Sequence, residues 1–397
     1  MNMGMIKNNI CPVCSSAEVW QFMEILQIPV YCNVLLSTKA EAMNVEKGDF
    51  RLGFCCDCGH IFNLSFNHEL LEYSQGYENS LHYSPRFQLY AEQLASDLIT
   101  RHGLRNRTVV EIGCGKGDFL RLLCRLGGNR GVGFDPSYEA QLDDEPYDEN
   151  IRFVQDYFGV DQPTYAADLI CCRHALEHIP LPTEFLRGLR ETIGDAEGTA
   201  VYFEVPNGLY TFRDMGIWDL IYEHCSYFWT GSLSRAFELA GFKVDVTQET
   251  YESQFIGLEA SISPEVQLEN KRLDRRLGEI KQYVVDFKHL YNQKISLWAT
   301  WLDEMQTTGT RVAVWGGGSK CGSFLNVLQV AKTCPVVVDI NPKKHGKFIP
   351  GTGQQVIPPE GLVEYQPEVV ILMNPIYEEE VTRLMRSLGI EAKILLA

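Results

Sequence analysis

Hydrophobic and polar positions alternate along this chain in the manner of an α/β protein. Short apolar runs, each followed by glycine or polar residues and then by a helical pattern, predict buried strands of a mainly parallel sheet. In the first half of the chain these runs lie at 109–112, 131–135, 167–172 and 201–205. The pattern restarts near the C-terminus, so we expect a second α/β unit with strands at 311–315, 335–339 and 368–373.

A long amphipathic helix is predicted between the two units, from about 264 to 306. Apolar residues recur there every three or four positions and form one continuous stripe. The stripe consists of Leu273, Leu277, Ile280, Val284, Phe287, Tyr291, Ile295, Trp298, Leu302 and Met305. We expect this face either to pack across two domains or to mediate dimerisation, so the protein is expected to be a monomer or a homodimer.

Composition narrows the possible partners. The chain has 397 residues, of which 45% are hydrophobic and 22% charged, as in globular proteins of two or three domains. Its net charge is −17, and no basic stripe of the kind that binds phosphate backbones is present, so we expect no nucleic-acid partner. The chain shows no signal-type segment and no apolar run of membrane-spanning length, so we expect no membrane partner and a cytoplasmic location.

Two Cys-x-x-Cys pairs near the N-terminus predict a metal site, because four thiolates can surround Zn²⁺ tetrahedrally. Cys56 and His60 are competing ligands, whereas Cys32 is expected to take no part. A redox Cys-x-x-Cys is the rival interpretation, but one pair would suffice for that chemistry. We therefore expect a structural zinc centre with the ligands Cys11, Cys14, Cys55 and Cys58.

A glycine-rich turn follows the strand at 109–112. Glycine allows the backbone to pass close to a ligand, and the helix that begins next offers free amides. The nicotinamide fingerprint would need glycine where Asp118 stands. The order Glu-x-Gly-x-Gly-x-Gly instead resembles motif I of class I S-adenosylmethionine (SAM) methyltransferases. We assign to the cofactor site Glu111, Gly113, Gly115 and Gly117; the alternative is a Rossmann-like unit for another nucleotide.

Two later segments carry acids at the positions that a SAM site needs. Asp135 ends the strand at 131–135, where a carboxylate can accept both ribose hydroxyls. Asp156 and Tyr157 follow the segment Phe153-Val154-Gln155 and suit the edge and face of an adenine. Three elements in this order favour a SAM cofactor.

Polar loops after the next two strands contain the candidate catalytic residues. Ligands of an open α/β sheet lie beyond the carboxyl ends of its strands, so His174 and His178 face the site. We assign His174 to the cofactor and leave His178 open between catalysis and packing. Glu223 and His224 sit in a second loop beside Tyr222. A histidine has the pKa of a general base and a carboxylate can orient it, although sequence neighbours do not necessarily touch.

Several further residues are candidates for binding the substrate. The polar aromatic segment with Tyr77 and Tyr83 is either a lid over the pocket or a capped helix entry. Tyr227 lies in the same loop as His224. Lys320 follows a glycine run at 316–318 and is placed either to bind a diphosphate or to sit in a purely structural turn.

Together these motifs resemble the deoxysugar C-methyltransferases, which act on nucleotide-linked 4-keto sugars, over nearly the whole chain. The most specific match is Glu223-His224-x-Ser226-Tyr227-Phe228, which is similar to the family's Tyr-His-Glu-His-x-Ser-Tyr segment and makes His224 the proposed base. The chain reads Ile-Tyr-Glu-His there, so Tyr222 takes either the tyrosine or the histidine place. Its loop Gly-Gly-Gly-Ser-Lys-Cys-Gly also departs from the family's Gly-Ala-Ala-Ala-Lys-Gly, which suggests a subfamily with an acceptor other than the known sugars.

The resemblance implies four segments: a zinc-binding domain (1–75), a class I SAM methyltransferase core (76–262), a connecting helix (263–306) and a cofactor-free Rossmann-like substrate domain (307–397). It implies that His224 removes a proton beside a ketone of a nucleoside-diphosphate sugar and that the enolate takes the methyl group of SAM. Tyr222, Tyr227 and His178 are candidate donors to the enolate oxygen. The alternatives are a SAM-dependent O- or N-methyltransferase of another small metabolite and a non-catalytic scaffold that has kept the fold.

Overall fold

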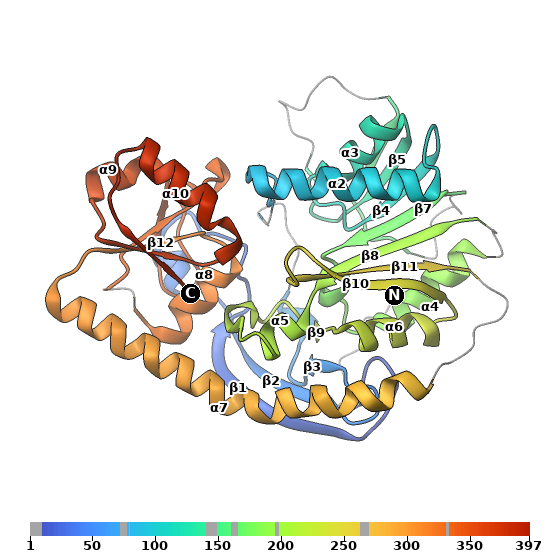
Figure 1. The fold of residues 1–397 in the computed structure, drawn as a ribbon, viewed down its shortest axis with the longest axis horizontal. Coiled ribbons are helices and arrows are strands. Elements are labelled where there is room, and N and C mark those ends of the chain that lie inside the picture. Colours follow the sequence, from blue (N-terminus) through green and yellow to red (C-terminus); the bar gives the residue numbers. More distant parts are fainter. Residues whose placement is uncertain are drawn as a thin grey trace.

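The structure, a computed structural model, describes residues 10–71, 78, 80–139, 149–159, 166–194, 198–262, 270–330 and 333–397. These residues build three sheets, of four, seven and five strands, as Figure 1 shows. The expected α/β architecture with two separate units is confirmed, and an antiparallel N-terminal sheet is added to it.

The seven-stranded sheet forms the central unit, in the order β10-β11-β8-β7-β4-β5-β6. Its strands are β4 (Thr108–Ile112), β5 (Arg130–Phe134), β6 (Ile151–Val154), β7 (Leu169–Arg173), β8 (Ala200–Pro206), β10 (Lys243–Thr250) and β11 (Phe255–Ser261). All neighbours pair in parallel except at β11, which runs antiparallel to β8 and β10. The helices of this unit are α2 (Pro85–His102), α3 (Asp118–Gly127), α4 (Pro182–Ile193), α5 (Gly208–Phe212) and α6 (Thr230–Leu239).

The four-stranded sheet is antiparallel and draws strands from two parts of the chain. β1 (Val19–Pro29), β2 (Lys47–Cys55) and β3 (Ile61–Asn63) come from the N-terminal segment, which also forms the short helix α1 (Lys39–Met43). The fourth strand, β9 (Ser226–Tyr227), belongs to the segment that follows the central unit's β8. The loop that contains His224 is therefore tied to the N-terminal sheet, which the sequence pattern did not predict.

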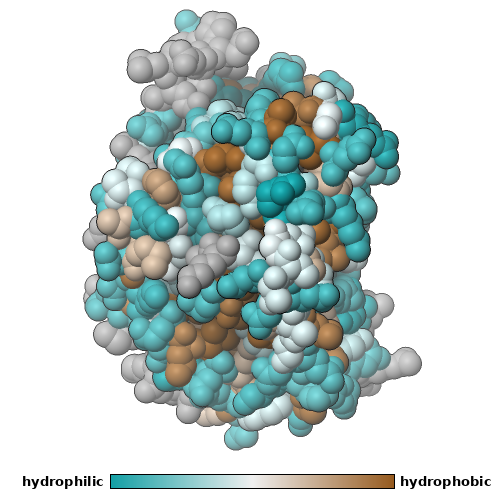
Figure 2. Space-filling view, turned by 90° about the vertical axis from the view of Figure 1, so that its left-hand side faces the viewer, coloured by the Kyte–Doolittle hydropathy of each residue, from teal (hydrophilic) through white to brown (hydrophobic). Residues whose placement is uncertain are grey.

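The C-terminal unit is a parallel five-stranded sheet in the order β14-β13-β12-β15-β16. Its strands are β12 (Val312–Trp315), β13 (Val336–Val338), β14 (Gln355–Ile357), β15 (Val369–Leu372) and β16 (Lys393–Leu396), and its helices are α8 (Ser319–Leu328), α9 (Leu362–Tyr365) and α10 (Glu378–Ser387). Figure 2, which views the molecule from the side of this unit, shows a mainly hydrophilic face with scattered hydrophobic residues.

Helix α7 (Asn270–Thr308) connects the central and C-terminal units, close to the predicted 264–306, and runs along one side of the molecule (Figure 1). It contacts β1, α5 and α8, so its apolar stripe packs against all three units. Within the stripe, Ile280, Val284, Phe287, Tyr291, Trp298 and Leu302 are buried; the side chain of Leu273 lies outside the described part. The prediction that the apolar stripe packs across domains is thus confirmed.

One hydrophobic cluster extends through all three sheets, from Phe54 in β2 to Phe203 in β8 and Val314 in β12. Edge-to-face aromatic pairs lie at the junctions, such as Trp218 against Phe324 of α8 with ring centroids 4.8 Å apart. Among the described helices, none combines the length and the apolar character needed to cross a bilayer.

Replacing Phe287 by alanine is expected to lower the free energy of unfolding by about 3–5 kcal/mol, because the side chain is fully buried and packs against Phe212 at 4.8 Å. Leu297→Ala, on the same helix, should change it by less than about 0.5 kcal/mol, since Leu297 is 72% exposed. Chemical denaturation of both variants measures the difference. Equal losses would contradict the assignment of the buried stripe.

Candidate active site

The glycine loop after β4 has a backbone that only glycine adopts readily. Gly113, Gly115 and Gly117 have φ of +70°, +54° and +86°. A Cβ atom at Gly117 would lie 2.4 Å from the Phe153 ring, and one at Gly113 would lie 2.7 Å from the Cβ of Ala175. A Cβ at Gly115 would meet no atom within 4 Å, so the loop is packed on both flanks and open in the middle, where a ligand can approach.

Asp135 lies at the same edge of the sheet, directly after β5. Its Oδ2 accepts a hydrogen bond from the Gly115 amide at 2.8 Å, and its Oδ1 accepts two from Ser137, from the amide at 2.8 Å and the hydroxyl at 2.6 Å. Asp156 and the half-exposed Tyr157 follow β6, the next strand of the sheet. The predicted acid, aromatic ring and glycine loop thus gather at one edge, and their chemistry fits the ribose and adenine of SAM.

Glu111 sits at the end of β4 with 3% of its surface exposed. Burial raises the pKa of its carboxyl to about 8, and its Oε2 makes no hydrogen bond within the described residues. The carboxyl is therefore mostly protonated at neutral pH. Its role as a cofactor ligand stays a prediction.

A buried ionic cluster holds the loop after β7, and the sequence analysis missed it. Arg173 donates two hydrogen bonds to Glu204 Oε1, at 3.0 and 2.8 Å, and Glu204 also accepts from the Tyr90 hydroxyl. Although burial raises the pKa of Glu204, Arg173 and His174 hold it well below its usual range. A glutamate within the apolar run of β8 was the available signal.

His174 turns toward this cluster. It has a left-handed backbone, with φ of 53°, and its Nε2 lies 3.1 Å from Glu204 Oε1. Its ring therefore supports the Arg173–Glu204 pair in this structure, and its assignment to the cofactor stays a prediction.

His178 and His224 come together from different loops. Their ring centroids are 4.9 Å apart with planes at 79°, and His178 Nδ1 lies 3.0 Å from the backbone carbonyl oxygen of Glu223. Burial lowers the pKa of His178 to about 4, and burial with the neighbouring His178 lowers the pKa of His224 well below its usual value. Both rings are therefore neutral at pH 7, the state in which an imidazole accepts a proton.

Glu223 does not orient His224 in the expected way. Its carboxylate is fully buried, makes no hydrogen bond to His224, and has a pKa that burial raises to about 8. The contact that Glu223 makes with the histidine pair is through its backbone carbonyl, to His178. This correction follows from geometry, because Glu223 lies in a turn that the His224 amide closes onto the Ile221 carbonyl, and its carboxylate does not meet the neighbouring ring.

The two tyrosines of this loop hold the backbone in place. The Tyr222 hydroxyl accepts from the Asn67 amide at 2.9 Å and lies 3.4 Å from the Ser65 carbonyl oxygen, both in the N-terminal segment. The Tyr227 hydroxyl accepts from the Ile221 amide at 3.1 Å. Both side chains are buried, so in this structure they serve the fold rather than an acceptor.

The other predicted substrate residues have separate surroundings. Tyr77 lies outside the described residues. Tyr83 is partly buried, and burial together with Glu78 and Asp118 raises its pKa. Lys320 forms an ion pair with Asp219, and its ammonium lies 5.1 Å from the centre of the Tyr210 ring. Its charge therefore joins the C-terminal unit to the central unit.

The four predicted zinc ligands converge. The Sγ–Sγ distances are 3.5 Å for Cys11–Cys58 and for Cys14–Cys55, and all four sulfurs lie within 4.8 Å of one another. A tetrahedral Zn²⁺ with four thiolates separates its sulfurs by about 3.8 Å, so the cluster fits this ion, and none of the four forms a disulfide. Of the competing ligands, Cys56 is not in this group, and His60 bonds Ser226 instead, with Nε2 3.2 Å from Oγ.

The N-terminal unit fixes the loop that carries His224. Besides the β3–β9 pairing, the Asn63 amide donates to the Cys225 carbonyl at 3.0 Å, and Trp229 Nε1 donates to the Gly59 carbonyl at 2.9 Å. Gly59 follows the second cysteine pair directly. The position of His224 therefore depends on the thiolate cluster.

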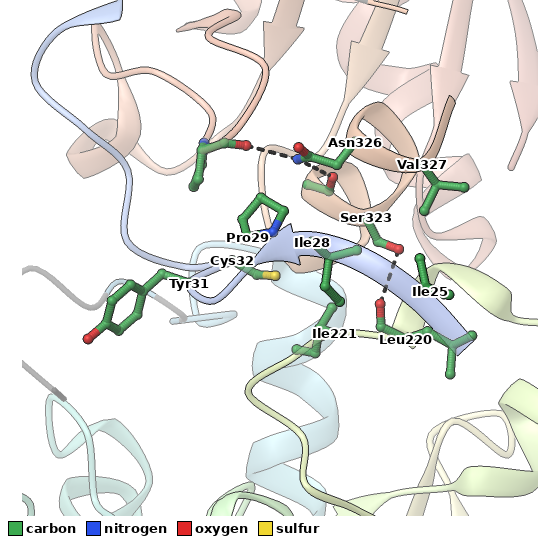
Figure 3. Close-up of a pocket in the computed structure, with 12 residues that line it drawn as sticks. Ile25, Ile28, Pro29, Tyr31, Cys32, Leu220, Ile221, Ser323, Asn326 and Val327 are labelled. Atoms are coloured by element: carbon green, nitrogen blue, oxygen red, sulfur yellow. Dashed lines mark hydrogen bonds between the residues drawn. The ribbon is translucent and has the colours of Figure 1, made fainter. Parts of the chain in front are cut away.

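A small, mostly apolar cavity lies between β1, the loop at 220–221 and α8 (Figure 3). Its wall includes Cys32, and Ser323 Oγ donates to the Leu220 carbonyl at 3.2 Å across it. Neither His178 nor His224 lines it, so it is a junction between the three units rather than the site of the histidines.

Comparison with known proteins agrees with this geometry. The family model of a methyltransferase domain matches residues 87–247, and that of a C-methyltransferase C-terminal domain matches residues 259–393; each covers less than half of the chain. No curated protein was found to match. The chain is therefore an enzyme, a methyltransferase, and the expected class I SAM methyltransferase fold is confirmed.

Solved structures of methyltransferases match less than half of this chain at low sequence identity. A SAM-dependent methyltransferase from Aquifex aeolicus is 18% identical over 43% of this chain and 89% of that chain, with a TM-score of 0.34. Magnesium protoporphyrin IX methyltransferase from Synechocystis, with bound S-adenosylhomocysteine, is 18% identical over 45% and 84%, with a TM-score of 0.35. The N1-methyltransferase of 1,6-didemethyltoxoflavin from Burkholderia thailandensis is 17% identical over 44% and 78%, with a TM-score of 0.34.

Cys14→Ser is expected to release the metal from the thiolate cluster and to lower the melting temperature by several degrees, because the β3–β9 connection loses its support. Cys56→Ser, the matched control outside the cluster, should keep about one zinc per chain. Elemental analysis and thermal unfolding measure both effects. A full zinc content in Cys14→Ser would exclude this ligand set.

Proposed function

We propose that this methyltransferase transfers the methyl group of SAM to a carbon beside a ketone, in a keto-deoxysugar linked to a nucleoside diphosphate. In this proposal His224 removes the proton and creates the enolate. We propose further that Zn²⁺ occupies the thiolate cluster formed by Cys11, Cys14, Cys55 and Cys58 and has a structural role, since four thiolates leave no open position for catalysis.

The observation that carries the proposal is the neutral pair His178–His224, 4.9 Å apart, beyond the carboxyl end of β7. That edge of the sheet also holds the glycine loop, since Gly113 packs against Ala175. Removing a proton from carbon requires a neutral base held next to the reacting carbon. Methylation of oxygen or nitrogen depends less on such a base, because those atoms already carry a lone pair.

The hydrogen bonds of the loop give the two histidines different roles in proton transfer. The Glu223 carbonyl accepts from His178 Nδ1, which places the proton of the neutral ring on Nδ1. His178 can therefore donate to an enolate oxygen only when Nε2 is protonated as well. Tyr222 and Tyr227 are bound to backbone groups, which leaves His178 as the candidate donor beside His224, but with its pKa lowered by burial to about 4 it must first take up a proton.

When bound, SAM supplies an electrophilic methyl group on a sulfonium. The glycine loop, Asp135 and Tyr157 would hold it, with the carboxylate on the ribose hydroxyls and the ring on the adenine. The role of these residues is to hold the methyl group in line with the carbon that His224 deprotonates, which lowers the entropic part of the barrier.

In this proposal the C-terminal unit binds the nucleotide part of the substrate. The match of residues 259–393 to a C-methyltransferase C-terminal domain supports a role in such enzymes. Lys320 begins α8 beside the glycine run 316–318, and its ammonium is the charge that would meet a diphosphate there. To do so it must exchange its ion pair with Asp219 for the ligand.

Replacing His224 by glutamine is expected to slow the exchange of the carbon-bound proton with solvent deuterium by about 10²–10⁴-fold, since general-base catalysis is lost. The binding of S-adenosylhomocysteine should remain. His289→Gln, at an exposed histidine on α7, is the control and should exchange at the wild-type rate. NMR of a keto-sugar nucleotide incubated in D₂O measures the rate.

Two results would separate the alternatives. Undiminished exchange in His224→Gln would remove His224 as the base. Methyl transfer by the wild type to oxygen or nitrogen, with no exchange at carbon, would favour an O- or N-methyltransferase instead.

Nucleoside diphosphates are expected to stabilise the wild type beyond S-adenosylhomocysteine alone. A ligand present at about 100 times its Kd adds about 2.7 kcal/mol to the stability of the native state. Lys320→Ala should lose this increment, whereas Lys343→Ala, an exposed lysine of the same unit, should keep it. Thermal unfolding with a panel of nucleotides identifies the nucleobase of the substrate. Stabilisation by S-adenosylhomocysteine alone would argue against a nucleotide-linked substrate.

A further inference from the structure

Glu177, His178 and His224 form a compact group of metal-binding side chains outside the thiolate cluster. Glu177 and His178 are consecutive in the short 3-10 helix Leu176–His178 after β7, and His224 lies just before β9. One carboxylate oxygen and one nitrogen of each imidazole lie within 4.8 Å of one another. Ligands around a divalent ion with bonds of about 2.1 Å are about 3.0–3.5 Å apart, so small side-chain rotations close the group around an ion.

The carboxylate of Glu177 has one oxygen that lacks a hydrogen-bond partner among the described residues. The residue is 1% exposed, and its Oε2 makes no hydrogen bond within the described part of the chain. A buried carboxylate oxygen without a partner is costly, and native proteins rarely keep one without a reason. Burial raises the pKa of Glu177 to about 8, and the Arg173 guanidinium at the end of β7 is already bonded to Glu204, so a cation from solution would be the charge that stabilises the ionised carboxylate.

The surroundings hold these side chains in the way that metal ligands are held. His178 Nδ1 is bonded to the Glu223 carbonyl at 3.0 Å, the kind of second bond that orients a metal-ligating imidazole, and it assigns Nε2 to the ion. Cys225 Sγ lies 3.2 Å from the Glu177 carbonyl oxygen and ties the two loops together on the other side of the group. The ring of His178 and the backbone of Glu177 are thus each held by a hydrogen bond to a residue outside the group.

We propose that Glu177, His178 and His224 bind a divalent transition-metal ion and that this ion competes with the substrate proton for His224. Two imidazoles and one carboxylate favour Zn²⁺, Co²⁺, Ni²⁺ or Fe²⁺ over Mg²⁺ and Ca²⁺, which prefer oxygen ligands alone. Three protein ligands leave an open position, unlike the closed thiolate cluster. The binding of the ion does not depend on the proposed function; only its competition with the proton does.

Cobalt titration of the full-length, zinc-loaded protein tests the binding. The wild type is expected to bind one Co²⁺ beyond the thiolate-bound zinc, with weak visible bands and without the intense charge-transfer band of thiolate-bound cobalt. Glu177→Gln and His178→Asn should each weaken this binding at least tenfold. Glu223→Gln, a second fully buried carboxylate outside the group, is the matched control and should bind Co²⁺ as the wild type does.

A wild type that binds no Co²⁺ beyond the thiolate site, or variants that bind it as tightly as the wild type, would overturn the proposal. If either variant fails to fold, the other decides, and the visible spectrum separates the two sites in the same sample.

Deuterium exchange in the same proteins tests the competition. Co²⁺ should suppress exchange by the wild type, a chelator should restore it, and Glu177→Gln should need at least tenfold more Co²⁺ for the same fractional suppression. Exchange that Co²⁺ leaves unchanged or increases would overturn the competition. Absence of exchange in every protein would refute the proposed function instead, while the cobalt titration would still decide the metal site.

Discussion

The pairing of β3 with β9 is the constraint on which the rest of the site depends. Ile61 faces Tyr227 and Phe62 faces Ser226, so a strand of two residues from the central unit completes a sheet that belongs to the N-terminal unit. A strand this short is not stable alone. It is held because the chain on the other side, between Cys55 and Asn63, is anchored by the thiolate cluster and by His60, whose ring reaches Ser226.

This constraint gives the N-terminal unit, with its four clustered cysteines, a role in a methyltransferase whose glycine loop belongs to the central sheet. The glycine loop and Asp135 are positioned within the central sheet alone, by β4 and β5. The proposed base is not, because the segment from Tyr222 to Trp229 is also bonded to the N-terminal unit, through Tyr222, Ser226 and Trp229. The central unit alone therefore positions the residues proposed to bind the cofactor. The position of the proposed base depends on all three units, which share one hydrophobic core.

Charge at the site is distributed unevenly. Arg173 and Glu204 satisfy each other in the interior, whereas Glu177 and Glu223 are buried beside two neutral histidines and keep carboxylate oxygens without hydrogen bonds among the described residues. A fold that tolerates such groups loses stability that packing elsewhere must offset. The unpaired carboxylate oxygen of Glu177 lies within reach of the histidine pair, and the metal proposal draws on this arrangement.

By itself the sequence determined what depends on local spacing. Four features follow from neighbours a few positions apart, and the structure has them where the pattern predicted. They are the two Cys-x-x-Cys pairs, the glycines at 113, 115 and 117, the strand ends that carry polar loops, and the apolar stripe of α7. It also predicted that His178 and His224 belong to one edge of the sheet, because strand ends share that edge.

Only the tertiary structure decided which atoms meet. Tyr222 reaches the N-terminal segment, the Glu223 carbonyl rather than its carboxylate meets His178, and Arg173 pairs with Glu204. These contacts join residues distant in the chain, and they depend on the direction in which each side chain leaves its loop, which hydrophobic periodicity does not encode.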